Sequence, residues 1–377
     1  MQIKDRIVTW WIQNIITPKR EIIDRPGFVV TTFTEHKQTT YLRDLFIPEK
    51  LFEMIENKIV QTYGDQGKQA LYSAGKKFGY VYASMSNFPT IKKRTKKELT
   101  DFAYLFVRYC ETLFAKRAIH NSNIEQKTFI ISFDGYIICR NNGLGYIMTE
   151  GATAGVWAYV MQDKTIEGIQ IKCQGRGDEQ CSVICAPDEK LQKEKNNFFH
   201  ERELPEQKFD IKYKALNEIR EVTHSVNSLQ KLINSGFFSY HEGILSYKGM
   251  RFFGCESHIL YILEQEISKL PDGEQILFDA CFEYGKLLRE TYGGRDFQKF
   301  IPDFFPALGF GDVFVFDPNI PSIAAIYYPW TMFSEKSNYI IFRGIMSGLV
   351  SNSVGKNIKF NNWKITVRSY LTLTINP

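Results

Sequence analysis

The sequence lacks the patterns that would place it in several large classes of protein. No run of about 18 apolar residues occurs in the 377-residue chain, so we expect no membrane-spanning helix. Its first residues show no apolar stretch followed by small residues, so we expect no secretory signal. The formal net charge is only +5, far below the excess typical of a nucleic-acid binder. The sequence therefore predicts no nucleic-acid partner.

Catalytic motifs are also missing. The sequence contains no phosphate-binding loop, no Gly-x-Ser-x-Gly and no His-Glu-x-x-His. None of its six histidines stands at a recognisable spacing from a carboxylate or a cysteine. Nicotinamide and flavin signatures are absent as well, and hydride chemistry needs such a cofactor. These absences favour a protein that is not an enzyme, with no catalytic residues and no organic cofactor.

Cysteine usage predicts the compartment. The seven cysteines are odd in number and scattered, in a chain long enough to fold without disulfides. Such a pattern is typical of a reducing environment, so we expect a cytoplasmic protein. Aromatic residues, by contrast, are abundant at 15%, with 30 Phe and 20 Tyr. This abundance indicates large cores or a cavity lined by aromatic side chains.

Hydrophobic periodicity predicts a mixture of helices and strands. An amphipathic helix is expected over residues 3–16, and a further helical segment over 212–235. The other expected helices span about 48–63, 67–85, 98–114 and 146–161. Strands are expected at 28–33, 128–133, 166–174 and 180–185, the last two joined by a turn at 175–178.

The first part of this pattern recurs later in the chain. The segment Gln69–Gly79 aligns with Gln275–Gly285, and the segment Tyr146–Gly151 aligns with Tyr339–Gly344. Glycines spaced four apart follow in both copies, and each copy ends at a proline. Because several short matches occur in the same order, we interpret the sequence as an internal duplication.

Residues 151–187 carry a resemblance to a known family. Small residues at 151–155 precede Cys173-Gln-Gly-Arg-Gly-Asp-Glu-Gln-Cys181, which resembles the Cys-x-Gly-x-Gly-Asp-x-x-Cys hairpin of the 4-vinyl reductase domain family. The resemblance implies a fold shared with small subunits of the transport protein particle and with phenol-sensing domains of transcription activators. It also implies a tendency to dimerise and an interior that holds a small apolar ligand. Vinyl reduction itself is not expected, because no cofactor signature is present.

The resemblance gives a fold class and domain boundaries. We expect an α+β protein with two tandem copies of a small antiparallel sheet and flanking helices, the second copy being degenerate. The expected parts are an N-terminal helical arm (1–27), the first domain (28–187), a polar linker (188–208) and the second domain with a leading helix (209–377).

Cys173 and Cys181 match the hairpin cysteines that hold a structural zinc in the phenol-sensing relatives. The glutamate of that site is Gln170 here, and residues 144–150 contain no cysteine. Structural zinc takes four ligands, so the set is incomplete. Three interpretations stay open: a zinc site, two buried thiols, or a redox-active disulfide.

The resemblance favours a non-enzymatic sensor-like module that binds a small hydrophobic ligand and acts through a separate protein partner or as a homodimer. The candidate ligand-binding residues are Phe106, Tyr109, Phe129, Phe133 and Trp157. One alternative is a protein-interaction scaffold with filled cores, for which residues 326–330 would be a contact if they face solvent. The other is an accessory protein that handles a tetrapyrrole.

Overall fold

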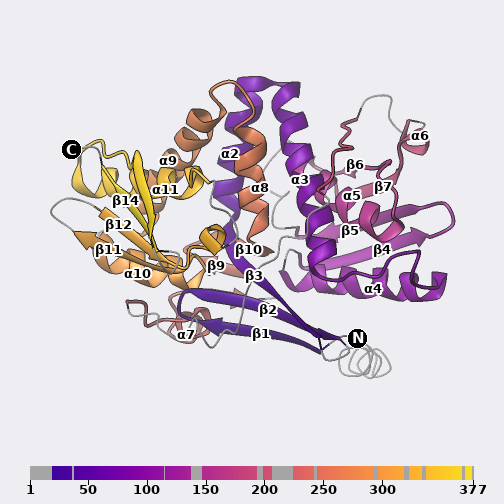
Figure 1. Cartoon of the computed structure of the whole chain (residues 1–377), viewed down its shortest axis with the longest axis horizontal. Helices are drawn as coiled ribbons and strands as arrows, with labels where there is room; N and C mark the ends of the chain where they lie inside the picture. The colour runs from indigo at the N-terminus through magenta and orange to yellow at the C-terminus, as the bar shows by residue number, and fades with distance from the viewer. Residues whose placement is uncertain are drawn as a thin grey trace.

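The computed structural model describes residues 19–35, 38–113, 115–136, 147–192, 198–205, 224–241, 244–292, 296–317, 322–332, 337–366 and 370–375. Over these residues the protein is an α+β structure in which three antiparallel sheets are flanked by helices (Figure 1). The helix expected over 3–16 and the side chain of Tyr109 lie outside this description. None of the described helices is both long enough and apolar enough to cross a membrane.

The first half of the chain builds one layer of helices against a four-stranded sheet. Its elements are β2 (Phe28–Glu35), β3 (Gln38–Pro48), α2 (Glu49–Tyr63), α3 (Asp65–Met85), α4 (Lys96–Leu113), β4 (Arg117–Asn123), β5 (Thr128–Asp134), α5 (Ile147–Met161), β6 (Ile166–Lys172) and β7 (Cys181–Pro187). The sheet has the order β4-β5-β7-β6. Helix α5 is buried on almost every side, which explains its nearly all-apolar sequence.

The second half has the same succession of strands and helices. Its elements are β9 (Ile244–Tyr247), β10 (Met250–Glu256), α8 (His258–Ile267), α9 (Gly273–Tyr292), α10 (Phe297–Ala307), β11 (Asp312–Asp317), β12 (Ser322–Ile326), α11 (Ile340–Val354), β13 (Asn362–Thr366) and β14 (Tyr370–Thr374). Its sheet has the order β11-β12-β14-β13. Strands that correspond in chain order therefore occupy the same places in the two sheets. The remaining elements are β1 (Lys19–Arg25), α6 (Asp188–Leu191), α7 (Leu229–Asn234) and β8 (Ser239–His241).

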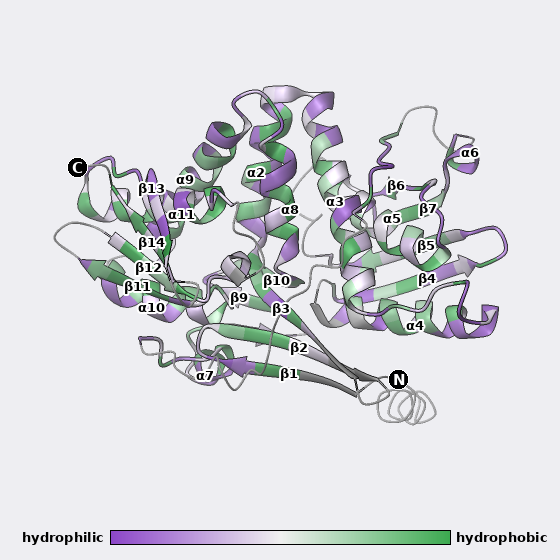
Figure 2. Ribbon diagram, viewed as in Figure 1, coloured by the Kyte–Doolittle hydropathy of each residue, from purple (hydrophilic) through white to green (hydrophobic). Residues whose placement is uncertain are grey.

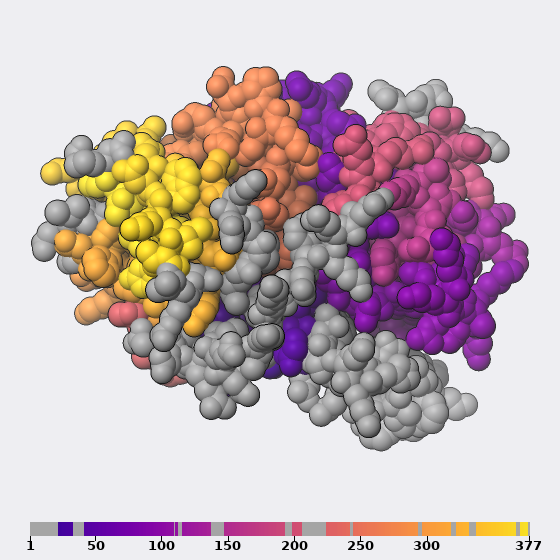
Figure 3. Space-filling model, viewed as in Figure 1, coloured from indigo at the N-terminus to yellow at the C-terminus, as the bar shows by residue number. Residues whose placement is uncertain are grey.

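A central six-stranded sheet joins the two halves. Its order is β1-β2-β3-β10-β9-β8, so β3 of the first half pairs with β10 of the second. The pairing is antiparallel, with Ile47 opposite Phe253. Buried Arg43 of β3 donates to the carbonyl oxygens of Gly27 at 2.7 Å and Gly309 at 2.8 Å, which ties this sheet to the second half. Figure 3 shows the first half in indigo to magenta and the second in orange to yellow, with indigo and orange atoms in contact where the halves meet.

Glycines let two helices approach closely in each half. A Cβ built on Gly79 of α3 would lie 2.0 Å from the carbonyl oxygen of Ala152 of α5, so only glycine fits there. In the second half, a Cβ on Gly285 of α9 would lie 2.1 Å from the carbonyl oxygen of Ile345 of α11.

The reverse contacts match in the same way. A Cβ on Gly155 would meet the carbonyl oxygen of Lys76 at 2.1 Å, and one on Gly348 would meet that of Phe282 at 1.9 Å. The two helix pairs therefore have the same register. Gly79 corresponds to Gly285, Ala152 to Ile345, and Lys76 to Phe282.

The fold class and most of the expected elements agree with the structure. Hydrophobic residues gather in the sheets and on the helices that cover them, whereas α6 is hydrophilic (Figure 2). The helix expected over 212–235 differs: residues 212–223 lie outside the described residues, 224–228 are not helical, and α7 begins only at Leu229. Ser228 caps α7 by accepting from the N–H of Lys231, and a cap of this kind sets the start of a helix.

Candidate functional site

An apolar cavity of about 90 Å³ lies where the first half meets the second. The first half supplies side chains from α2, α3, α4, β5 and α5, and the second half supplies side chains from β10 and α8. The second-half wall consists of Phe253, Cys255, Glu256 and Ile259. Because both halves form the wall, a molecule in this cavity would contact both.

The polar groups of the wall make hydrogen bonds to the protein. The hydroxyl of Tyr136 lies 3.0 Å from that of Thr149, and the hydroxyl of Thr153 donates to the backbone carbonyl of Thr149 at 2.9 Å. The carboxylate of Glu256 accepts from the backbone N–H of His258 at 2.9 Å, and its Oε1 lies 2.8 Å from Nδ1 of the same residue. The rest of the wall is mainly carbon, so the cavity favours an apolar molecule.

Larger side chains stand at the corresponding positions of the second half. The shared register of the helix pairs matches Ala152 with Ile345 and, one residue further, Thr153 with Met346. By the same register Thr149 corresponds to Phe342 and Val156 to Leu349. All four second-half residues are buried. The face of α5 that borders the cavity thus carries smaller side chains than the equivalent face of α11.

The structure separates the five candidate ligand-binding residues. Phe106 of α4 and Phe133 of β5 line the cavity. Phe129 and Trp157 do not line it; their rings stack on each other at 4.6 Å in the core. The side chain of Tyr109 lies outside the description. The candidates from the sequence include one residue of α4 and one of β5 that line the cavity, but not the positions of α3 and α5 that do so, because these depend on the helix pairing.

The two hairpin cysteines are buried thiols. The sulfur of Cys181 accepts from the backbone N–H of Gln174 at 3.3 Å, and the N–H of Cys173 donates to Asp178 at 2.7 Å. Within the described ranges, no three His, Cys, Asp or Glu side chains lie close enough together to hold a metal ion. These contacts therefore shape the turn, and the described residues supply no zinc ligand set.

The aromatic segment 326–330, considered above as a protein contact, lies mainly in the core. Tyr328 and Trp330 are fully buried, and their rings are 4.5 Å apart. Tyr328 also packs on Phe342 at 4.6 Å. This segment therefore does not provide the solvent-facing surface that a docking partner would need.

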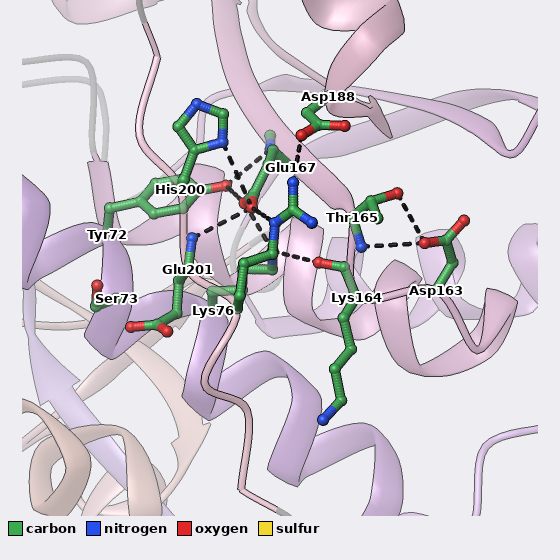
Figure 4. Close-up of polar contacts among 12 residues, drawn as sticks. Tyr72, Ser73, Lys76, Asp163, Lys164, Thr165, Glu167, Asp188, His200 and Glu201 are labelled. Atoms are coloured by element: carbon green, nitrogen blue, oxygen red, sulfur yellow. Dashed lines mark hydrogen bonds and ion pairs between the residues drawn. The ribbon is translucent and has the colours of Figure 1, made fainter.

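A buried ion pair, which the sequence did not reveal, joins α3 to β6 (Figure 4). Nζ of Lys76 lies 2.7 Å from Oε2 of Glu167, and neither side chain is exposed. The hydroxyl of Tyr72 donates to the same carboxylate oxygen at 2.6 Å and accepts from the backbone N–H of Gly168 at 2.9 Å. Because β6 is an edge strand, Tyr72 also satisfies one of its open backbone groups.

Residues 198–205, here called the strap, cover this ion pair. The backbone N–H of Glu201 donates to Oε1 of Glu167 at 3.2 Å, and Gln69 of α3 donates to the carbonyl oxygen of His200 at 2.7 Å. The strap is the described end of the polar run that was expected to be a linker. It packs against the first half instead of extending into solvent.

Lys77, the next residue of α3, links the strap to the second half. Its Nζ lies 3.0 Å from the carboxylate of Glu201 in the strap and 3.1 Å from that of Glu266 in α8. One ammonium group therefore bridges two segments that are 65 residues apart in sequence, with α3 between them. All three side chains are largely shielded from solvent, which strengthens the attraction.

Burial dominates the electrostatics of the ion pair. It lowers the pKa of Lys76 and raises the pKa of Glu167, and the attraction between the two opposes both shifts. Burial also raises the pKa of Tyr72. A lysine with a lowered pKa is typical of nucleophilic catalysis, but this one has no exposed surface through which to reach a substrate. The group therefore holds the strap and β6 in place.

No family model and no curated protein matches this chain. Among solved structures, it is similar to the crystal structure of the phenol-responsive sensory domain of the transcription activator PoxR with phenol. The identity is 14% and the TM-score 0.31, over 42% of this chain and 85% of that domain. Similarity at this level is too weak to assign a family, so the resemblance of residues 151–187 to the 4-vinyl reductase domain family stays a prediction.

Proposed function

We propose that this protein is a non-enzymatic module that binds a small apolar ligand in the cavity between its halves. The observation that supports the proposal is the contrast between equivalent positions: Ala152 and Thr153 border a cavity, whereas the larger Ile345 and Met346 are buried in the core of the second half. A ligand in contact with both Phe106 and Phe253 would bias how the halves pack, and such a change can pass to a separate protein.

We propose further that the two halves descend from one duplicated unit. The equal order of the sheets and the equal register of the glycine contacts support this. In this proposal the second half lost its cavity and became the partner that closes the cavity of the first. The domains would then be 28–187 and 209–377, as the sequence suggests.

The size of the cavity limits the ligand. An engineered apolar cavity of about 150 Å³ binds benzene, so about 90 Å³ accepts a ring only if wall side chains turn aside. A ligand that buries about 100 Å² of apolar surface gains about 2.5 kcal/mol before entropic costs. We therefore expect single-ring compounds to bind weakly, with a Kd of about 10 mM or above, and a ligand that matches the polar groups near Thr149 and Glu256 to bind more tightly.

The test is calorimetric titration and thermal unfolding with toluene, phenol and cyclohexanol as probes. Wild type should bind at least one of them and unfold at a higher temperature in its presence. The double variant Ala152→Ile/Thr153→Met places the second half's side chains in the cavity and should abolish binding. Thr100→Met, on the exposed side of α4, is the matched control and should bind like wild type.

Two results would overturn the proposal. The first is that no probe binds wild type, which would favour the scaffold with filled cores. The second is that the double variant folds and binds as well as wild type, because the ligand would then sit elsewhere. A bound tetrapyrrole, visible as colour in the purified protein, would favour the accessory-protein alternative.

A further inference from the structure

A groove of about 500 Å³ lies between α2 of the first half and α9 of the second. Figure 1 shows the two helices side by side at the junction of the halves. The groove is lined by Lys50, Glu53, Met54, Asn57, Lys58, Gln61, Asp279, Ala280, Phe282, Glu283, Asn357 and Lys359. It is separate from the apolar cavity and shares no residue with it.

The equivalent position in the first half is occupied by the strap. Helix α8 packs beside α3 as α2 packs beside α9, and Phe282 and Glu283 of the groove correspond to Lys76 and Lys77. Lys76 lies beneath the strap, and Lys77 bonds both the strap and α8. The strap thus lies along the pair of helices α3 and α8. The equivalent pair, α9 and α2, borders the open groove.

The charges of the groove indicate what sort of segment fits. Lys50 pairs with Glu53 at 2.9 Å, and Lys286 pairs with Glu283 at 3.0 Å, so these two acids are held by neighbours on their own helices. Asp279 accepts a hydrogen bond from Gln275 at 2.7 Å.

Two cations remain. Among the described residues, neither Lys58 nor Lys359 forms an ion pair, and both are exposed. The Nζ of Lys359 lies 6.0 Å from the ring of Phe278, and that ring is 6.3 Å from the ring of the partly buried Phe282, which lines the groove. The groove therefore combines an aromatic surface with two cations available to an incoming carboxylate.

We propose that this groove is the docking site for an extended acidic segment of a protein partner, which lies along α2 and α9 as the strap lies along α8 and α3. Carboxylates of the segment pair with Lys58 and Lys359, and an apolar side chain packs on Phe282. The proposal rests on the geometry of the groove and is independent of whether the cavity binds a ligand.

The experiment measures fluorescence anisotropy of labelled eight-residue peptides on the full chain. The probe alternates glutamate with phenylalanine, and its partner alternates lysine with phenylalanine. We expect the acidic peptide to bind at least tenfold tighter than the basic one. The variant Lys58→Glu/Lys359→Glu should weaken the acidic peptide at least tenfold. The variant Lys93→Glu/Lys97→Glu, with the same charge change in the exposed basic run, should leave binding within twofold.

Three results would overturn the proposal. The first is that the two peptides bind equally, or that neither binds. The second is that both double variants weaken binding of the acidic peptide alike, which would show non-specific attraction. The third is that the chain self-associates and Lys58→Glu/Lys359→Glu abolishes this, which would make a second copy the occupant. Toluene titration of Lys58→Glu/Lys359→Glu keeps the two proposals apart, because ligand binding in the cavity should be unchanged whatever the peptides do.

Discussion

Replacing Lys76 with methionine is expected to destabilise the protein by about 3–5 kcal/mol, because it removes the closest cation from a buried carboxylate. Glu167 has no exposed surface, so water cannot replace the lost ammonium group. The hydroxyl of Tyr72 and the N–H of Glu201 still donate to it, and Nε of Arg202 still lies 3.8 Å from its Oε1, which sets the lower end of the range. Methionine has an unbranched side chain only one heavy atom shorter than that of lysine, so little of the loss comes from packing.

The loss should depend on pH. Burial already raises the pKa of Glu167, and the attraction of Lys76 opposes this rise, so the pKa climbs further in the variant. A carboxyl whose pKa is higher in the folded than in the unfolded state contributes stability below its unfolded pKa, near about 4.3. That stability is lost as pH rises through the folded pKa. The destabilisation should therefore be smaller at about pH 5 than at about pH 8.

Urea unfolding with linear extrapolation measures both effects. Lys68→Met, on the same helix, is the control: within the part of the chain that the structure describes, Lys68 pairs with the exposed Asp65 alone, so its loss should cost less than about 1 kcal/mol. The double variant Lys76→Met/Glu167→Gln should recover part of the stability, because no charge is then buried. A cost for Lys76→Met equal to that of Lys68→Met, or a cost identical at the two pH values, would refute the reasoning.

Two further changes test the helix pairs and the second core. Gly79→Ala should cost about 3 kcal/mol or more in urea unfolding, since its Cβ would lie 2.0 Å from a backbone carbonyl oxygen. Gly355→Ala, which has open space and left-handed φ and ψ of +67° and +22°, should cost about 1 kcal/mol; equal costs would contradict the close approach of α3 and α5. Burial raises the pKa of Glu264 to about 8, so wild-type stability should fall as pH rises from about 4.3 towards that value. Glu264→Gln should lack this fall, and parallel pH profiles for the two proteins would show that Glu264 is not the cause.

The sequence predicted those elements whose signal is local. Helix α3 was expected at 67–85 and spans Asp65–Met85, because its apolar residues recur with helical spacing over five turns. The turn between β6 and β7 was expected from the composition of residues 175–178, and its Gly177 has a φ of +98°, which few other residues adopt. The glycines that align in the sequence, Gly79 with Gly285 and Gly155 with Gly348, also make equivalent helix–helix contacts in the two halves.

The buried groups could not be predicted, because their partners are distant in sequence. Tyr72 and Lys76 meet Glu167 only after α3 has packed on the sheet, and nothing near either residue signals the other. The cavity is harder still, since Cys255 and Ile259 enter its wall through the pairing of β3 with β10. A linear sequence shows that these side chains are apolar but not which of them face an unfilled volume.

The pairing of β3 with β10 makes the two halves poor candidates for separate expression. Each half produced alone would end its share of the central sheet in a bare strand, with β3 or β10 offering unsatisfied backbone groups to any neighbour. Such edges promote aggregation, and the most suitable neighbour for each is the other half. Co-expressed as two polypeptides, the halves should therefore reassemble into one soluble particle, because the pairing of β3 with β10 lets each half recognise the other.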